Sequence, residues 1–268
     1  MFSWSDEWNN RAEALSSAGL YDTKNEHDAC GVGFVASIDG TPKRAIVEAG
    51  IAALKAVYHR GAVDADGKTG DGAGIHVQIP LDFFQHEITQ SGRALISDTL
   101  AVGMMFLPRK NLSAQETCRS IVEAEILKLG YRIYGWRQVP VRSDVIGEIA
   151  GDSRPEIEQI LIAGKNEQDP ARFELEMYFI RKRIENAVRA KAINDFYICS
   201  LSSRSVIYKG LFKAEQLTEF YPDLLDARFV SNFAIFHQRF STNTAPAWHL
   251  AQPFRMIAHN GEINTLKG

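Results

Sequence analysis

Strand-like patterns that follow one another in pairs, instead of alternating singly with helices, constrain the fold of this chain most. Residues 196–202 and 205–208 are two short apolar runs that we predict to form a hairpin, and residues 230–240 alternate again. Residues 32–38 predict a buried strand closed by an Asp39–Gly40 turn, 75–79 a half-buried strand, and 100–107 an apolar strand ended by Pro108. Adjacent strands favour layered sheets over single βαβ units. We therefore predict an α+β fold in which helices pack on largely antiparallel sheets.

Helical patterns occur between these strands. In residues 45–58 the apolar side chains have helical spacing, with Ile51, Leu54 and Tyr58 on one stripe. Ser113 and Glu116 predict a capping box at the start of a second helix, which Gly130 ends. Residues 181–190 predict a third helix.

Composition excludes several classes of protein. Of the 268 residues, 45% are hydrophobic and 24% are charged, which is typical of a globular protein. The net charge of −3 offers no field that would attract nucleic acid or an anionic membrane. No apolar run approaches the roughly 18 residues of a membrane span, and three scattered cysteines indicate reduced thiols. We expect a cytoplasmic protein (or a stromal one, in a photosynthetic eukaryote) with no nucleic-acid or membrane partner.

The first 29 residues differ from the rest. They contain six acidic and two basic side chains, so they carry a net charge of −4. This segment has neither the basic start and apolar centre of a secretory signal nor the acid-poor character of a transit peptide. Composition leaves two interpretations open: a solvated acidic arm, or a prosegment that ends before Cys30.

Several ligand-binding motifs are incomplete. Residues 31–36 superficially fit a dinucleotide fingerprint, but a strand-like run stands where the helix should follow. Residues 67–69 end like a phosphate loop, yet Ala62 occupies the glycine position, and Lys68 occupies a ligand position of a calcium loop over 64–75. The spacing of His237, His249 and His259 does not indicate a metal site, so we expect core or hydrogen-bonded histidines.

A glycine-dense stretch remains after these exclusions. Five glycines lie between residues 61 and 74. Such a loop can bring backbone amides close to a ligand, or it can be a tight surface loop.

The C-terminal stretch combines polar groups with a predicted strand end. Arg239 has a planar guanidinium suited to a carboxylate. Asn260 and Gly261 offer a side-chain amide and an unobstructed backbone N–H, the two donors that an oxyanion hole needs. Asn-Gly alone indicates a β-turn more often than an oxyanion hole.

Four motifs resemble the class II glutamine amidotransferases, which are N-terminal-nucleophile hydrolases. They are CGVGF at 30–34, YHRGA at 58–62, TGDGAG at 69–74 and the run from 237 to 265. The segments SSRSVIYKG, RFSTNTAPAWHLAQPFR and HNGEINT are similar to the glutaminase domain of the glutamate synthase large subunit. The resemblance implies a four-layer αββα sandwich, a prosegment at 1–29 that is removed on maturation, and an amidotransferase domain at 30–268 that is incomplete at its C-terminal end.

The resemblance also implies a glutaminase chemistry. Cys30 would become the first residue and attack the side-chain amide of L-glutamine, with its own α-amine as general base. Asn260 and Gly261 would hold the oxyanion, and Arg239 would bind the substrate carboxylate. Water would then hydrolyse the Cys30 thioester and release glutamate.

The ammonia from this step would reach synthase domains of the same polypeptide, which make glutamate from 2-oxoglutarate. We expect no cofactor in this chain, but FMN and an iron–sulfur cluster in the remainder of the enzyme. An electron-donating subunit or ferredoxin would be the further partner.

Two departures from the family pattern affect these expectations. Cys30 is internal as written, and the chain stops eight residues after Asn260. We therefore expect an N-terminal fragment of a longer polypeptide, with weak or absent glutaminase activity by itself. Two alternatives stay open: another N-terminal-nucleophile amidase or acylase, and a non-catalytic binding module of the same fold in which Cys30 is a structural thiol.

Overall fold

A computed structural model of the chain describes residues 13–14, 31–238 and 246–256. The chain divides into two units, Met1–Cys30 and Gly31–Gly268. In the first unit only Glu13 and Ala14 are described, and both are helical. The predicted boundary after Ala29 lies outside the described residues and stays a prediction. The elements below all belong to the second unit.

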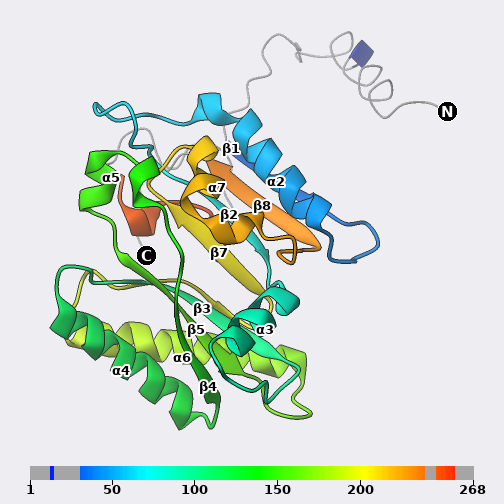
Figure 1. Ribbon diagram of the computed structural model, residues 1–268, viewed down its shortest axis with the longest axis vertical. Helices are drawn as coiled ribbons and strands as arrows, with labels where there is room; N and C mark the ends of the chain where they lie inside the picture. Colours follow the sequence, from blue (N-terminus) through cyan, green and yellow to red (C-terminus); the bar gives the residue numbers. More distant parts are fainter. Residues whose placement is uncertain (1–12, 15–30, 239–245, 257–268) are drawn as a thin grey trace. The chain divides into compact units, whose positions relative to one another are not determined.

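The first sheet contains four antiparallel strands in the order β1 (Gly31–Ala36), β8 (Phe233–Gln238), β2 (Ala73–Gln78) and β7 (Ser205–Gly210). Helix α2 (Arg44–Ala56) crosses β1, β8 and β2 (Figure 1). It buries Val47, Ile51 and Leu54. Gly50 permits this close packing, since a Cβ there would lie 2.6 Å from the Cβ of Ala234.

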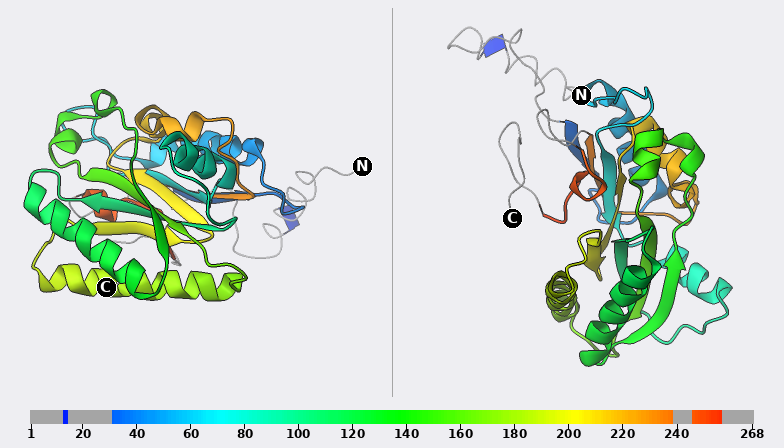
Figure 2. Two further views of the ribbon diagram at one scale, coloured as in Figure 1. Left: turned by 60° about the horizontal axis from the view of Figure 1, so that its bottom comes forward. Right: turned by 90° about the vertical axis from the view of Figure 1, so that its left-hand side faces the viewer.

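The second sheet is also antiparallel, in the order β4 (Arg132–Gln138), β5 (Glu156–Ala163), β3 (Leu100–Leu107) and β6 (Tyr197–Ser202). Helices α4 (Leu112–Lys128) and α6 (Pro170–Ala190) pack against each other and cover one face of this sheet (Figure 2). Apart from two short helices between β4 and β5, the chain order is β3-α4-β4-β5-α6-β6, and with the strand order it makes a split βαβ, ferredoxin-like arrangement.

Shorter helices connect these elements. Helix α3 (Leu81–Gln90) follows β2, α5 (Glu148–Asp152) lies between β4 and β5, and α7 (Leu217–Phe220) lies between β7 and β8. The 3₁₀ turns are η2 (Tyr58–Arg60), η3 (Ser143–Val145), η4 (Ala214–Gln216), η5 (Pro222–Leu225) and η6 (Trp248–Leu250).

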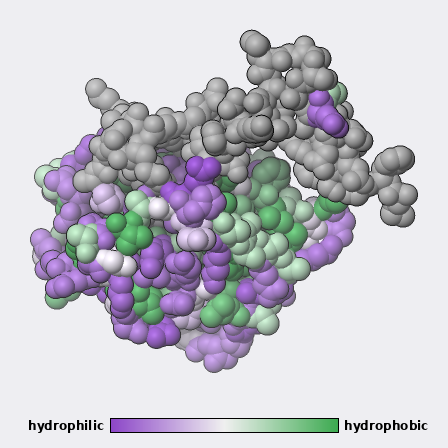
Figure 3. All heavy atoms as spheres, turned by 90° about the horizontal axis from the view of Figure 1, so that it is seen from above, coloured by the Kyte–Doolittle hydropathy of each residue, from purple (hydrophilic) through white to green (hydrophobic). Residues whose placement is uncertain are grey.

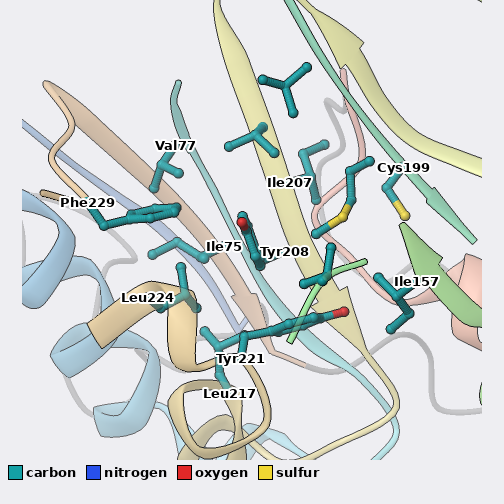
Figure 4. Close-up of a cluster of buried hydrophobic side chains, with 14 of the residues drawn as sticks. Ile75, Val77, Ile157, Cys199, Ile207, Tyr208, Leu217, Tyr221, Leu224 and Phe229 are labelled. Atoms are coloured by element: carbon teal, nitrogen blue, oxygen red, sulfur yellow. The ribbon is translucent and has the colours of Figure 1, made fainter. Parts of the chain in front are cut away.

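Alternate residues of β3 divide between two hydrophobic cores because successive side chains of a strand point to opposite faces. Ala101, Met105 and Leu107 pack with α4 and α6, whereas Val102, Met104 and Phe106 belong to the core shared with the first sheet. Figure 4 shows residues of both sheets in this shared core, among them Ile75 and Tyr208 of the first sheet and Ile157 of the second.

The observed architecture confirms the predicted α+β class with largely antiparallel sheets, and it is consistent with a four-layer αββα sandwich. Strand β3 has the predicted bounds, and residues 181–190 form the second half of α6. The Asp39–Gly40 turn is present, with Gly40 at a φ of 70°. Gly130, at a φ of 76°, follows the end of α4 as predicted.

Two helix predictions are wrong in detail. Helix α2 ends at Ala56, and Tyr58 lies in the following 3₁₀ turn with 62% of its surface exposed. The cap of α4 is Asn111, whose Oδ1 accepts a hydrogen bond from Ala114 N (3.0 Å). Ser113 is therefore already inside the helix, and the predicted capping box does not form.

Two strand predictions are also wrong. Strands β6 and β7 do not form a hairpin, because the chain passes from the second sheet to the first between Ser202 and Ser205. Strand β1 is an edge strand instead of a buried one, and Val32 and Phe34 are 41% and 74% exposed.

The face seen in Figure 3 is mixed in character, with groups of apolar residues between polar ones.

Candidate active site

Four strand ends of the first sheet form one row, which we call the terminal row: Gly31, Gln238, Ala73 and Gly210. Gly31 is the first residue of β1 and lies opposite Gln238, the last residue of β8. Gln238 lies opposite Ala73, and Ala73 lies opposite Gly210. The row is tightly packed, because a Cβ on Gly31 would lie 2.4 Å from the backbone oxygen of Gln238. At this end of the sheet, therefore, strands β1 and β2 begin and strands β8 and β7 end.

The predicted site residues Cys30, Arg239, Asn260 and Gly261 all lie outside the described residues. In the chain, however, Cys30 directly precedes Gly31, and Arg239 directly follows Gln238.

The glycine-dense stretch forms an ordered loop between η2 and β2, which we call the glycine loop (residues 61–72). A short bridge pairs Val63 with Gly70. Asp71 closes the loop, since its Oδ1 accepts a hydrogen bond from Ala62 N (3.0 Å) and its own N–H donates to Ala62 O (3.2 Å). At Gly61 a Cβ would overlap the side-chain amide of Gln238, so the loop packs directly on the terminal row.

Asp66 organises the other end of the glycine loop. Its carboxylate accepts hydrogen bonds from the Thr69 hydroxyl (2.6 Å), from Thr69 N (2.7 Å) and from Lys68 N (2.9 Å). These bonds, the Thr69 hydroxyl first, hold the pKa of the Asp66 carboxyl well below its usual range. The charged form of Asp66 therefore stabilises this turn.

A second segment, Pro246–Met256, packs beside the same edge of the sheet. Trp248 is 5% exposed and lies against Phe106, Phe212 and Phe220, with ring centroids 5.7–6.3 Å apart. A Cβ on Gly72 would lie 3.1 Å from that of Ala251. The segment and the glycine loop are thus in contact.

Lys209 of β7 binds backbone carbonyl groups of this segment. The side chain is 1% exposed, and Nζ donates to His249 O (2.9 Å) and Ala251 O (2.6 Å). The ammonium also lies 4.7 Å from the ring centroids of both Tyr197 and Phe254. Burial lowers the pKa of Lys209 to about 7.

Two of the three cysteines are in no position to act as nucleophiles. Cys118 and Cys199 are 0% and 1% exposed, in α4 and β6. Burial raises the pKa of Cys118 to about 11 and that of Cys199 to about 12. Because the thiolate is the reactive form, these thiols are inert at neutral pH.

Two buried glutamine side chains near the terminal row went unnoticed in the sequence. Gln238 and Gln252 are 2% and 1% exposed, and within the described ranges their Oε1 atoms accept no hydrogen bond. Lys209 was also missed, although it lies within the SSRSVIYKG segment. A local pattern does not reveal such residues, because burial here comes from segments far apart in the chain.

The histidines that the sequence singled out have ordinary surroundings. His237 is buried in β8, and His249 lies in η6. His259 is outside the described residues. A further histidine, His76 of β2, faces a cavity of about 870 Å³ beside α6 and β6, and burial lowers its pKa to about 4.

Neither a metal site nor a membrane span is found in the part of the chain that the structure describes. None of its His, Cys, Asp and Glu side chains gather in a group of three or more that could bind a metal ion. No described helix has the length and apolar character needed to cross a membrane.

Comparison with known proteins points to one family. Residues 30–268 match the family described as glutamine amidotransferases class-II. The chain is 65% identical over 257 residues to the glutamate synthase [NADPH] large chain of Azospirillum brasilense, an alignment that covers 96% of this chain and 17% of that protein.

More distant relatives have the same coverage pattern. The chain is 41% identical over 257 residues to the chloroplastic ferredoxin-dependent glutamate synthase of Oryza sativa subsp. japonica (95% of this chain, 16% of the relative). It is 43% identical over 244 residues to ferredoxin-dependent glutamate synthase 2 of Synechocystis sp. (91% and 15%). The chain thus spans about one sixth of the length of these curated relatives. The motif resemblance is confirmed, and the chain belongs to the class II glutamine amidotransferases.

Proposed function

We propose that this chain is the glutaminase part of a glutamate synthase and hydrolyses the side-chain amide of L-glutamine through a thioester on Cys30. The observation that carries the proposal is the pairing of Gly31 with Gln238 in the terminal row. This pairing brings the chain ends that lead to Cys30 and to Arg239 to neighbouring positions of one sheet edge. A nucleophile on one of these chain ends and a carboxylate-binding guanidinium on the other would bind the two ends of a glutamine molecule.

The proposed reaction begins when residues 1–29 are removed and the α-amine of Cys30 is free. An α-amine has an ordinary pKa of about 7.7–8.0, so it can accept the thiol proton near neutral pH. The thiolate attacks the amide carbon, and the Asn260 side-chain amide and the Gly261 N–H stabilise the oxyanion. Arg239 binds the α-carboxylate of the substrate. The amine returns its proton to the leaving ammonia, and water then hydrolyses the thioester to glutamate.

The inert surroundings of Cys118 and Cys199 support the choice of Cys30 as nucleophile, because burial keeps both of those thiols protonated. We also infer that the ammonia passes to synthase domains of the same polypeptide, which convert 2-oxoglutarate to glutamate. The described residues do not fit an iron–sulfur cluster, since Cys118 and Cys199 lie apart in α4 and β6 and no group of metal-ligating side chains is present among the described residues. We assign FMN and the iron–sulfur cluster to the remainder of the enzyme.

The electron donor of the whole enzyme is a separate inference. The relative named for NADPH is 65% identical, whereas those named as ferredoxin-dependent are 39–43% identical. We infer NADPH. Turnover of the full-length enzyme with NADPH and its electron-donating subunit, compared with turnover on reduced ferredoxin, tests this inference, and turnover with ferredoxin alone would contradict it.

The decisive test of the glutaminase uses the full-length enzyme and measures glutamate released from L-glutamine. Cys30→Ala should abolish hydrolysis, whereas the matched variants Cys118→Ala and Cys199→Ala should keep it. Hydrolysis that survives in Cys30→Ala would refute the proposal. Acylation of Cys30 by other amides but not by glutamine would indicate a different amidase, and no acylation at all would indicate a binding module.

A further inference from the structure

The peptide groups around Ala150 connect α5 to both loops that border the terminal row. Ala150 is 0% exposed. Its N–H donates to the Thr69 hydroxyl of the glycine loop (3.2 Å), and its carbonyl accepts a hydrogen bond from Trp248 Nε1 (3.0 Å). One residue of a five-residue helix therefore holds two segments that lie about 180 residues apart in the chain.

At the Thr69 end of this connection the hydroxyl is buried, and it both donates and accepts a hydrogen bond. Thr69 is 1% exposed, and its hydroxyl donates to Asp66 Oδ2 while it accepts from Ala150 N. Ile149 N lies 3.4 Å from the same carboxylate oxygen. Gly147 permits the close approach, since a Cβ there would lie 2.2 Å from the Thr69 hydroxyl oxygen. The turn of the glycine loop thus packs against the start of α5.

The Trp248 side is equally specific. The indole ring fills an aromatic pocket, and the position of Ala150 O gives its N–H a partner that a phenyl ring would not need. Beyond Trp248, the contact between Ala251 and Gly72 brings the segment back to the glycine loop. Loop, helix and segment therefore form a closed set of contacts.

We propose that α5 is a clamp for the glutaminase site, and that Thr69 and Trp248 are positioning residues that act through its Ala150 peptide. This inference rests on the proposed function. A loop with so many glycines has a large conformational entropy when free, so it needs an external anchor to present one geometry. Segment Pro246–Met256 leads directly to the stretch that contains Asn260 and Gly261. Loss of the clamp would therefore displace reacting groups without removing any of them.

The test measures glutamine hydrolysis by the full-length enzyme carrying Thr69→Val, Trp248→Phe or both. Thr69→Val keeps the shape of the side chain and removes its hydrogen bonds to Asp66 and to Ala150 N, whereas Trp248→Phe removes the hydrogen bond to Ala150 O together with one ring of the indole. Displacement of reacting groups by about 1 Å can cost up to about 100-fold in rate. In Thr69→Val and in Trp248→Phe we expect kcat to fall about 10- to 100-fold with a smaller change in KM. We expect Thr69→Ser, which retains the hydroxyl, to keep most of the wild-type activity.

Two matched controls make the same substitutions elsewhere in the second unit. Thr117→Val removes a hydroxyl that donates to Ser113 O within α4, and Trp136→Phe removes an indole bond to Glu123. Both should leave kcat and KM within about twofold of the wild type. Thermal unfolding of every variant checks that each protein is folded.

The double variant tests the shared peptide. If both residues act through Ala150, the second substitution adds little to the first, so the combined loss is smaller than the product of the single losses. Losses that multiply would overturn the clamp, as would single variants no worse than the controls. Wild type and Cys30→Ala are assayed in the same series. Hydrolysis that is absent in the wild type, or retained in Cys30→Ala, would refute the proposed function and the clamp with it, whereas Cys30-dependent hydrolysis unaffected by the clamp variants would refute the clamp alone.

Discussion

A buried hydroxyl joins the two sheets, and its removal gives a measurable loss of stability. Tyr208 of β7 is 0% exposed and lies in the shared core shown in Figure 4. Its hydroxyl accepts a hydrogen bond from Gln159 Nε2 of β5 (2.9 Å) and donates to Asp223 Oδ2 (2.9 Å). Arg137 of β4 forms a bidentate pair with the same carboxylate, at 2.7 and 2.8 Å. Burial raises the pKa of Tyr208 well above its ordinary value, so the hydroxyl stays a donor.

The substitution Tyr208→Phe keeps the ring and removes both hydrogen bonds. A hydrogen bond between neutral groups contributes about 0.5–1.5 kcal/mol and one to a charged group about 1.5–3 kcal/mol. The Gln159 amide would also be left buried without its acceptor. We therefore expect the free energy of unfolding to fall by about 2–4 kcal/mol.

Urea unfolding of the 268-residue chain and its variants measures this loss. Tyr178→Phe is the matched control, because the Tyr178 side chain is 47% exposed. That control should change stability by less than about 0.5 kcal/mol. A loss in Tyr208→Phe as small as that of the control would refute the reasoning, because the network would then contribute nothing to the junction of the sheets.

Three further predictions concern the site. Gly70→Ala should destabilise the chain and impair hydrolysis by the full-length enzyme, because its Cβ would lie 2.4 Å from the Phe212 carbonyl carbon. The control Gly151→Ala has open space around its Cβ and should be neutral. Equal effects of the two substitutions in urea unfolding would contradict the prediction. The pKa of Lys209 is about 10.5 in the unfolded chain and about 7 in the folded chain, so between these pH values the unfolded chain binds more protons and the free energy of unfolding should rise with pH. Lys209→Met should lower the slope of unfolding free energy against pH by up to about 1.4 kcal/mol per pH unit. An unchanged slope would contradict the lowered pKa. Iodoacetamide should label Cys30 in the native, processed enzyme and spare Cys118 and Cys199, as peptide mass spectrometry can verify; rapid labelling of either buried thiol would contradict the raised pKa values.

The sequence predicts best those elements whose pattern is local. Strand β3 is recognisable because all eight of its residues are buried and apolar or small. Strand β4 has a mixed sequence, with one buried residue out of seven, so no periodic pattern identifies it. The hairpin prediction for β6 and β7 failed for a different reason. Proximity in the chain indicates pairing only when both strands belong to one sheet, and here hydrogen bonding to β3 and to β2 separates them.

The candidate site divides in the same way. The motifs identified the family and the glycine loop because these depend on residue types at fixed spacing. Lys209, Thr69 and Trp248 act through contacts with residues 40, 81 and 98 positions away, respectively, and such contacts leave no local pattern. Asn111 shows the limit for helix ends, since Asn111 and Ser113 are both good capping residues and tertiary packing decides between them.

N-terminal sequencing of the full-length enzyme purified from its native source is the most direct test of Cys30 as an N-terminal nucleophile. The proposed mechanism requires a chain that begins at Cys30, because only then is the α-amine free to act as the general base. An enzyme that hydrolyses glutamine while its chain still begins at Met1 or Phe2 would contradict the account, since the nucleophile would then work without the base that the mechanism requires.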